Sequence, residues 1–158
     1  DRSEHVTIHY VYKDGTLEAE TIDWQVPRWA NDDSAYGLPA RIKEWSTLLD
    51  QGCQLIGALE NDLLVGFAIF RPQLTEAMSQ LAVLHVSKDY RRQGIAQALM
   101  AEVIEMALAS GATRLYVSAT PSKSAVNFYR SQGFELAEKV HPELYAKEPE
   151  DIHMIKQL

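Results

Sequence analysis

The chain has 158 residues, the usual size of one globular domain; 46% of the residues are hydrophobic and 23% are charged. Its formal net charge of −7 argues against a nucleic-acid-binding protein, which would carry a basic patch. No apolar run approaches the roughly 18 residues needed to cross a membrane, so the composition predicts a single domain over residues 1–158 with neither a nucleic-acid nor a membrane partner.

Cys53 is the only cysteine. One thiol cannot form an internal disulfide, and neither a Cys nor a His lies near it at the spacing of metal ligands. We therefore expect a cytoplasmic protein without a metal, in which Cys53 is a small buried side chain in a reducing compartment.

The first third of the sequence predicts a hairpin, a loop and a helix. Residues 6–12 and 17–24 are rich in β-branched and aromatic side chains, and Asp14-Gly15 between them is a strong turn signal. Pro27 and Gly37 interrupt the following segment, which indicates loop or short helical turns. A helix is expected to begin at Leu38 and to end at Gly52.

The remainder alternates between strand and helix patterns. The clearest helix covers 94–110, where Ile95, Leu99, Val103 and Met106 recur at helical spacing. A second helix is expected over 122–131, strands over 53–59, 63–70, 81–86, 114–119, 134–140 and 152–158, and a polar loop over 141–151. This order predicts a mixed α/β domain with one sheet of about six or seven strands.

The segment that leads into the clearest helix has the features of an anion site. The first N–H groups of a helix have no partner within it and point outward. Gly94 allows a phosphate to approach the backbone closely, and Ala96 keeps the next turn low. Arg91 and Arg92 add positive charge to an acidic protein. The alternative interpretation is a solvated basic turn before an ordinary helix.

Two motifs together resemble the GNAT superfamily of N-acetyltransferases. Arg91-x-x-Gly94-x-Ala96, after a strand that ends in Leu84-x-Val86, is similar to the loop that binds the pyrophosphate of acetyl-CoA. The run from Asn127 through Tyr129 to Phe134 is similar to the family's helix and turn that carry a tyrosine. The similarity is good over roughly 53–134 and poor over the first 50 residues.

The resemblance implies a mostly antiparallel sheet of about six or seven strands, flanked by about four helices, that splays open to hold acetyl-CoA as co-substrate. Backbone groups of 84–86 would pair with the pantetheine arm, an N–H near Val86 would polarise the thioester carbonyl, and N–H groups of 92–97 would hold the pyrophosphate. The residues implied for coenzyme binding are Leu84, His85, Val86, Arg91, Arg92, Gln93, Gly94, Ile95, Ala96, Gln97, Ser122, Asn127 and Tyr129. Ser122 stands where the family often has Asn.

The resemblance also implies that Tyr129 protonates the departing CoA thiolate. Proton transfer from a phenol with a pKa near 10 to a thiolate near 8.5 is uphill by only about 2 kcal/mol. The alternative is that Tyr129 simply packs in the core.

An alkylammonium must also lose a proton before it can attack, which costs about 4–5 kcal/mol at pH 7. Many relatives use a Glu on the strand corresponding to 81–86, but this strand carries no carboxylate, and Val117 occupies another position where some relatives have Glu. His85 is the remaining titratable group on the strand, either as the base or as a structural residue. Glu76 and Glu143 are further candidates.

In the family, the segments that correspond to 24–45 and 141–151 shape the acceptor pocket. Aromatic walls are expected from Trp24, Trp29, Tyr36 and Trp45, and attraction of an ammonium from Asp32 and Asp33. The alternative is the more usual one for each: aromatic side chains in short helical segments pack more often in the core than in a pocket, and an Asp pair is more often a solvated turn or a helix cap.

The expected reaction is direct attack of a primary amine, on a small molecule or peptide, upon acetyl-CoA. The first alternative is a non-catalytic module that binds acyl-CoA on the same fold. A nucleotide site is the second, and the missing Gly-x-x-x-x-Gly-Lys-Ser/Thr pattern argues against it. Exposed edge strands leave room for a homodimer.

Overall fold

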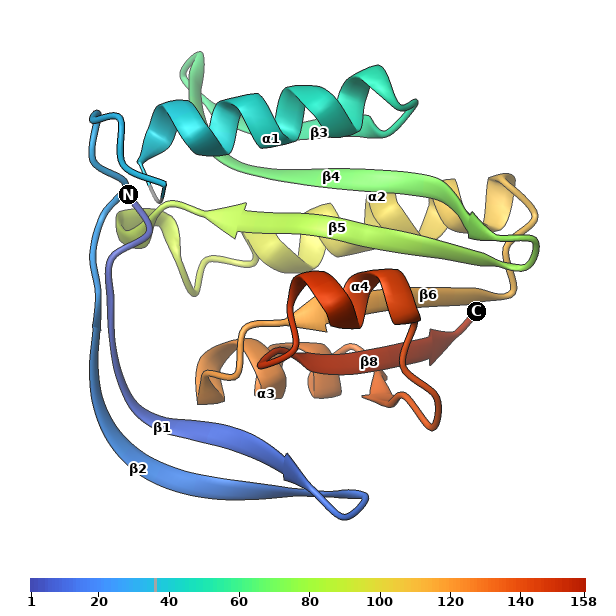
Figure 1. Ribbon diagram of the computed structural model, residues 1–158. Helices are drawn as coiled ribbons and strands as arrows, with labels where there is room; N and C mark the ends of the chain where they lie inside the picture. Colours follow the sequence, from blue (N-terminus) through green and yellow to red (C-terminus); the bar gives the residue numbers. More distant parts are fainter. Residues whose placement is uncertain (36) are drawn as a thin grey trace.

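Two sheets and four α-helices make up the computed structural model, which describes residues 1–35 and 37–158 (Figure 1). β1 (Glu4–Lys13) and β2 (Thr16–Val26) form a two-stranded antiparallel sheet. The six-stranded sheet has the order β3-β4-β5-β6-β8-β7. Its strands are β3 (Gln54–Glu60), β4 (Leu63–Thr75), β5 (Met78–Val86), β6 (Arg114–Ala119), β7 (Glu135–Leu136) and β8 (Ile152–Gln157), and the helices are α1 (Leu38–Asp50), α2 (Ile95–Ala109), α3 (Lys123–Ser131) and α4 (Pro142–Lys147).

The central strand β4 is covered on both faces. Phe67 and Ile69 belong to the cluster that includes Trp45 of α1, whereas Ala68 and Phe70 belong to the larger cluster with Leu99 of α2. Successive side chains of a strand point to opposite faces, so α1 and α2 lie on opposite sides of the sheet (Figure 1). This burial explains why β4 reads as a continuous apolar run.

The sheet is divided between β5 and β6. These two strands are parallel, and they pair only where Met78, Ser79 and Gln80 lie beside Arg114, Leu115 and Tyr116. Beyond these pairs they diverge toward the end of β5 (Figure 1). The mixed α/β fold and the splayed sheet that the resemblance implied are thereby confirmed.

The first hairpin forms a separate arm instead of joining the main sheet. Its turn places Asp14 and Gly15 at φ of 48° and 84°, the conformation that favours a tight hairpin. The arm contacts the segment before α3, where Tyr10 N donates to Pro121 O at 2.7 Å and His9 forms an isolated bridge with Ser122.

Two predictions for the last quarter are wrong. The strand expected over 134–140 is reduced to β7, and the loop expected over 141–151 contains α4. Pro142 explains the second difference, because its fixed φ suits the first turn of a helix. Cys53 is buried, as predicted. None of the helices that the structure describes is long and apolar enough to span a membrane.

Candidate active site

The loop between β5 and α2 presents open backbone. Gly94 is the N-cap of α2 with φ of 84°, and Arg92 also has a positive φ, 60°, which is uncommon outside glycine. No side chain caps α2, so the N–H groups at its first turn have no partner within the helix. A Cβ at Gly94 would meet no atom within 4 Å. The loop therefore has the geometry to receive a phosphate.

Gly66 of β4 brings this helix start close to the end of β5. A Cβ at Gly66 would lie 3.0 Å from the carbonyl oxygen of His85, 3.1 Å from Ile95 Cγ2 and 3.3 Å from Val86 Cγ2. Because Gly66 has no side chain, Ile95 at the start of α2 can pack against β4 beside Val86 at the end of β5. The predicted residues 84–86 and 91–97 are brought together at one end of the divided sheet.

The two arginines of the loop have different environments. Arg91 donates from Nε to Val86 O at 3.1 Å and from Nη2 to Arg2 O at 3.0 Å, so its guanidinium holds the N-terminal segment against the end of β5. Arg92 is exposed and forms no hydrogen bond or ion pair with any residue that the structure describes. Of the two, Arg92 is the cation that is free to meet an anion at the helix start.

The carboxylate of Glu4 links the loop before α2 to the first turn of α3. Its carboxylate accepts hydrogen bonds from Arg91 Nη1 at 3.4 Å and from Ser124 Oγ at 2.5 Å. Arg91 belongs to the loop before α2 and Ser124 to the first turn of α3, so the carboxylate lies between the two helix starts.

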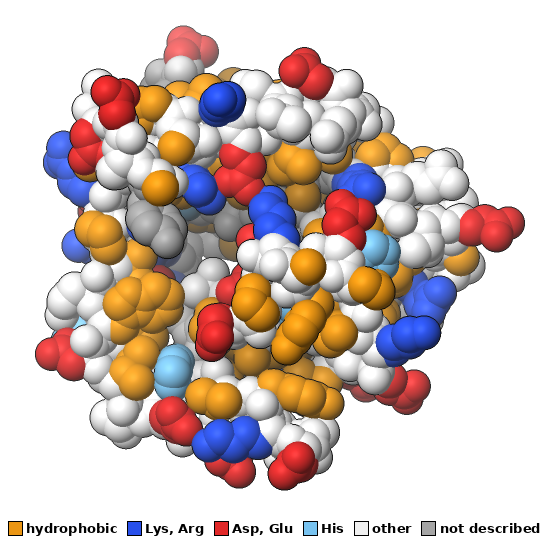
Figure 2. Space-filling view, in the orientation of Figure 1, with side chains coloured by type: hydrophobic (Ala, Val, Ile, Leu, Met, Phe, Trp, Pro, Cys, Tyr) orange, Lys and Arg blue, Asp and Glu red, His pale blue; other side chains and the backbone are white. Residues whose placement is uncertain are grey.

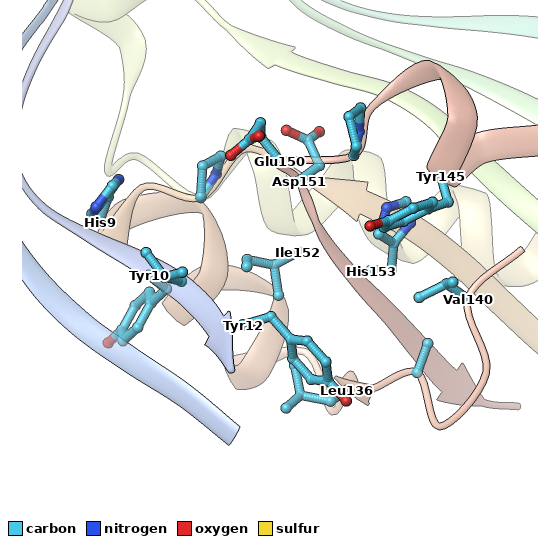
Figure 3. A pocket seen from close by; sticks show the side chains of 14 residues that line it. His9, Tyr10, Tyr12, Leu136, Val140, Tyr145, Glu150, Asp151, Ile152 and His153 are labelled. Atoms are coloured by element: carbon cyan, nitrogen blue, oxygen red, sulfur yellow. The ribbon is translucent and has the colours of Figure 1, made fainter. Parts of the chain in front are cut away.

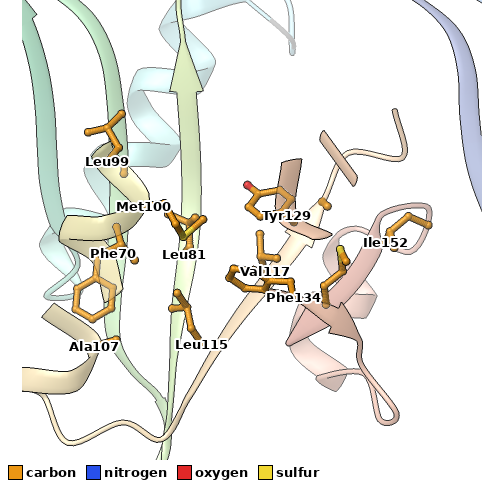
Figure 4. Packing of buried hydrophobic residues seen from close by; sticks show 14 of the residues in the cluster. Phe70, Leu81, Leu99, Met100, Ala107, Leu115, Val117, Tyr129, Phe134 and Ile152 are labelled. Atoms are coloured by element: carbon orange, nitrogen blue, oxygen red, sulfur yellow. The ribbon is translucent and has the colours of Figure 1, made fainter. Parts of the chain in front are cut away.

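α3 carries Tyr129 into the divided part of the sheet. The helix begins at Ser122, whose hydroxyl accepts from Ala125 N at 3.3 Å. The Tyr129 ring packs against Phe134 with centroids 5.5 Å apart, and only 8% of the residue is exposed. In Figure 4 the ring lies above Val117 and its hydroxyl points toward the β5 side.

The Tyr129 hydroxyl forms no hydrogen bond with any residue in the described part of the chain. The residue is buried as a whole, but its hydroxyl oxygen is not among the enclosed polar atoms that lack a partner, so the hydroxyl is open to a ligand. Burial, and secondly the Asp151 carboxylate, raise the pKa of Tyr129 above its ordinary value, so the residue is a protonated phenol at neutral pH.

Ser122 and Asn127 both lie at the side of α3 that β1 contacts. The buried Ser122 hydroxyl is used for capping and for a 3.0 Å contact with Ser124 Oγ. The exposed Asn127 accepts from the Tyr10 hydroxyl at 3.3 Å. Their contacts with the coenzyme stay predictions of the family resemblance.

His85 lies on the α1 side of the sheet within aromatic side chains. Its ring centroid is 4.5 Å from that of Trp29 and 5.6 Å from that of Phe67. Burial lowers its pKa to about 4, helped by the positive charges of the N-terminus, Arg91 and Arg2. A neutral imidazole of such low basicity is a poor acceptor for the proton of an ammonium.

The other two carboxylates considered from the sequence lie away from this end of β5 or are paired. Glu76 is in the turn between β4 and β5, at the opposite end of β5 from Val86. Glu143, on α4, is exposed and accepts from Arg71 Nη1 at 3.2 Å.

A cavity of about 390 Å³ lies between β1 and the segment that leads into β8. In Figure 3, Glu150 and Asp151 lie along one edge, with His9 and Tyr10 on one side and Tyr145 and His153 on the other. Figure 2 shows this face hollowed beside the hairpin, with hydrophobic side chains on both sides of the hollow. Aromatic rings and carboxylates suit an alkylammonium ligand.

Asp151 is the residue that the sequence did not single out. Burial, and secondly the Glu148 carboxylate, raise its pKa to about 7. The signal in the sequence is the run Glu148-Pro149-Glu150-Asp151 directly before an apolar strand, in which Glu148 and Asp151 are half-buried and Glu150 is exposed. The expectation that 141–151 contributes to a pocket agrees with this cavity, which Tyr145 and Asp151 line.

The aromatic residues of the 24–45 segment separate into different environments. Trp29 and Trp45 line a second, apolar cavity of about 400 Å³ between α1 and the sheet. Trp24 on β2 is 38% exposed and lines neither cavity. Asp32 is a turn residue that accepts from Ser34 N at 3.1 Å. Tyr36 lies outside the described residues.

The start of α2 lies beside β5, which has separated from β6, and Tyr129 lies on the side of this separation. This arrangement defines an acyl-CoA-dependent transferase fold. The chain belongs to the acetyltransferase (GNAT) family, whose model matches residues 18–134. Its fold and family therefore assign acyl transfer from acetyl-CoA. No curated protein matches the chain in sequence.

Several solved structures share the fold. Nourseothricin acetyltransferase is 22% identical with a TM-score of 0.71, over 99% of this chain and 88% of that one. A putative streptothricin acetyltransferase from Bacillus anthracis str. Ames, in complex with acetyl coenzyme A, is 16% identical with a TM-score of 0.71, over 100% and 88%. The PaiA N-acetyltransferase from Thermoplasma acidophilum, in complex with coenzyme A, is 16% identical with a TM-score of 0.60, over 78% and 73%.

Proposed function

We propose that the protein is an N-acetyltransferase that moves the acetyl group of acetyl-CoA to a primary amine by direct attack, with Tyr129 as general acid. The observation that carries the proposal is Tyr129, a buried residue whose hydroxyl has no partner in the described chain and points toward the side where β5 and β6 have separated.

The chain's own residues fit the coenzyme. The open backbone at Gly94 and the unpartnered N–H groups of α2 suit a diphosphate, with Arg92 as a free cation beside it. The edge of β5 beyond Gln80 has no strand partner within the described chain, so its main chain can pair with an extended pantetheine arm. Tyr129 can then protonate the sulfur that leaves.

We further propose a small cationic acceptor of the streptothricin class. Two matched structures with such names, nourseothricin acetyltransferase and the putative streptothricin acetyltransferase, cover nearly the whole chain including the β1–β2 arm, whereas PaiA covers 78%. The arm forms one wall of the cavity that holds Tyr12, Tyr145 and Asp151. Rings and carboxylates attract ammonium groups, and the net charge of −7 favours the approach of a cation.

The test is release of free thiol from acetyl-CoA with nourseothricin, spermidine and a lysine-containing peptide as separate acceptors. We expect turnover with nourseothricin or spermidine and a product that has gained one acetyl group by mass spectrometry. Turnover with the peptide alone would contradict the acceptor class. Protection from thermal unfolding by coenzyme A without turnover of any amine would instead support the non-catalytic acyl-CoA-binding module.

A further inference from the structure

Acetylation of an ammonium requires a group that accepts its proton, and β5 carries no carboxylate. We infer that Asp151, immediately before β8, accepts this proton directly or through one water. The inference rests on the proposed acetyl transfer and adds the proton acceptor to it.

Asp151 lines the cavity and is close enough to Tyr129 for its charge to act on the tyrosine hydroxyl. Ile152, the next residue, pairs with Ala119 at the end of β6 and packs in the same hydrophobic cluster as Tyr129. Asp151 is one of the lining residues, and Figure 3 shows its carboxylate at the cavity edge, pointing away from Ile152. An amine that enters the cavity therefore reaches a carboxylate whose charge also acts on Tyr129.

The turn that carries Asp151 is held by a buried hydrogen-bond network. The carbonyl oxygen of Glu148 accepts from Asp151 N at 3.3 Å and from His153 Nε2 at 3.1 Å. Because a carbonyl can only accept, His153 carries its proton on Nε2, and its Nδ1 accepts from the Tyr116 hydroxyl at 2.9 Å. Tyr116 in turn accepts from His141 N at 3.0 Å. This network fixes Asp151 in position, as a general base requires.

The carboxylate of Asp151 is free to take a proton. Within the described residues it forms no hydrogen bond and no ion pair. The titratable and charged groups around it come from its own loop, from β1, from α4, from β8 and from α3: Glu148, Glu150, His9, Tyr145, His153 and Tyr129. Burial raises the pKa of Glu148, as does the negative charge of Glu44, whereas the positive charges of Lys147 and Arg41 lower it.

These surroundings give Asp151 the proton affinity of a base that works near neutral pH. Burial and then Glu148 raise its pKa from 3.8 to about 7, which strengthens proton binding by about a thousandfold over an ordinary aspartate. His85, whose pKa is lowered to about 4, binds a proton far more weakly.

Asp151 and Tyr129 together account for every proton that moves in the reaction. The ammonium gives one proton to Asp151, its nitrogen lone pair forms the bond to the thioester carbon, and the carbon–sulfur bond breaks. The CoA sulfur receives the Tyr129 proton, and the second proton that leaves the nitrogen returns to Tyr129. Asp151 then releases its proton to solvent. Once protonated, Asp151 no longer bears the charge that raises the pKa of Tyr129, so accepting the first proton makes Tyr129 a better acid for the second step.

The experiment is the pH dependence of kcat/KM between pH 5.5 and 9.5 with spermidine and nourseothricin as acceptors. For the unmodified protein we expect an acidic limb with an apparent pKa near 7. Asp151→Asn should lower kcat by roughly 10²–10³-fold and remove that limb, while coenzyme A affinity measured by calorimetry stays unchanged. Asp151→Glu should retain the limb and recover part of the rate.

Glu138→Gln is the matched control, because Glu138 is an exposed carboxylate between β7 and α4 that does not line the cavity. It should leave both the rate and the profile unchanged. A folded Asp151→Asn protein that keeps the rate and the limb overturns the role of Asp151 and leaves the proposed acetyl transfer intact. Failure of the unmodified protein to acetylate any amine overturns the proposed function, and the role of Asp151 with it. If Asp151→Asn does not fold, loss of the limb in Asp151→Glu overturns the inference.

Discussion

The carboxylate of Glu4 lies 3.4 Å from Arg91 Nη1, so the start of β1 is ion-paired with the loop that precedes α2. The same carboxylate contacts Ser124 of α3, and it therefore places a negative charge between the two helix starts that we assign to the coenzyme.

Removing this charge should strengthen coenzyme binding. In Glu4→Gln, the repulsion between the carboxylate and the diphosphate is lost, and Arg91 keeps its bonds to the carbonyls of Val86 and Arg2. We expect coenzyme A to bind about two- to fivefold more tightly in low-salt buffer, with a smaller gain at high salt, because exposed charges are screened. Titration calorimetry at two salt concentrations measures this. Weaker binding would mean that Glu4 supports the loop more than it repels the ligand.

A bulky side chain at Gly94 should exclude the coenzyme. Since a Cβ there meets no protein atom within 4 Å, Gly94→Trp fills only the space in front of the helix start. We expect coenzyme A affinity to fall by at least about 10²-fold, which corresponds to about 2.7 kcal/mol.

Gly111 provides the control for Gly94, because it has nearly the same φ, 82° against 84°, and is equally open, but it follows the other end of α2. Both substitutions carry a backbone strain of about 1–2 kcal/mol. Gly111→Trp should therefore lower the thermal midpoint like Gly94→Trp and leave coenzyme affinity unaffected. Equal affinities in the two variants would contradict the assignment of the loop.

Tyr129→Phe should separate chemistry from binding. The variant loses the proton donor to the departing sulfur, so we expect kcat to fall by roughly 10²-fold while coenzyme A affinity changes little. Because the hydroxyl has no partner in the described chain, its removal breaks no hydrogen bond there and should change the free energy of unfolding little. An unaltered kcat in a folded variant would remove Tyr129 from the mechanism.

Asp151→Asn should stabilise the protein at alkaline pH. The native pKa of Asp151 lies above its ordinary value, at about 7 against 3.8, so its contribution to stability is greatest when it is protonated and declines as the pH rises from about 4 through 7. At pH 8 the amide removes a half-buried charge, a gain on the order of 1 kcal/mol after discounting for solvent, or roughly 2–4 °C in Tm. At pH 5 the difference in Tm should shrink to roughly a third of its value at pH 8, because the folded protein keeps the proton there and the unfolded chain has lost it. Differential scanning calorimetry at pH 5 and at pH 8 measures whether the Tm of Asp151→Asn lies above or below that of the unmodified protein.

The sequence predicts the elements that carry the coenzyme site well. The apolar run of β4, the helical spacing of α2 and the glycine at its start are local signals, and each is where the pattern indicates. The strand over 114–119 agrees with β6 at both ends. The family resemblance supplied the division of the sheet, which no local pattern encodes.

The acceptor side is less accessible from sequence because it depends on contacts between distant segments. The raised pKa of Asp151 arises first from burial, which depends on how distant segments pack, and only secondly from its sequence neighbour Glu148. His85 has the right side chain for a base, but Trp29 and Phe67, far from it in sequence, desolvate it. In both cases tertiary packing, more than residue type, sets the proton affinity.

The short pairing of β5 with β6 has a consequence for hydrogen exchange. Main-chain amides along the free edge of β5 after Gln80 can exchange with solvent deuterium without any unfolding of the sheet, whereas those bonded to β4 exchange only when the core opens. Deuterium uptake by this one strand should therefore divide into a fast and a slow population at alternate residues.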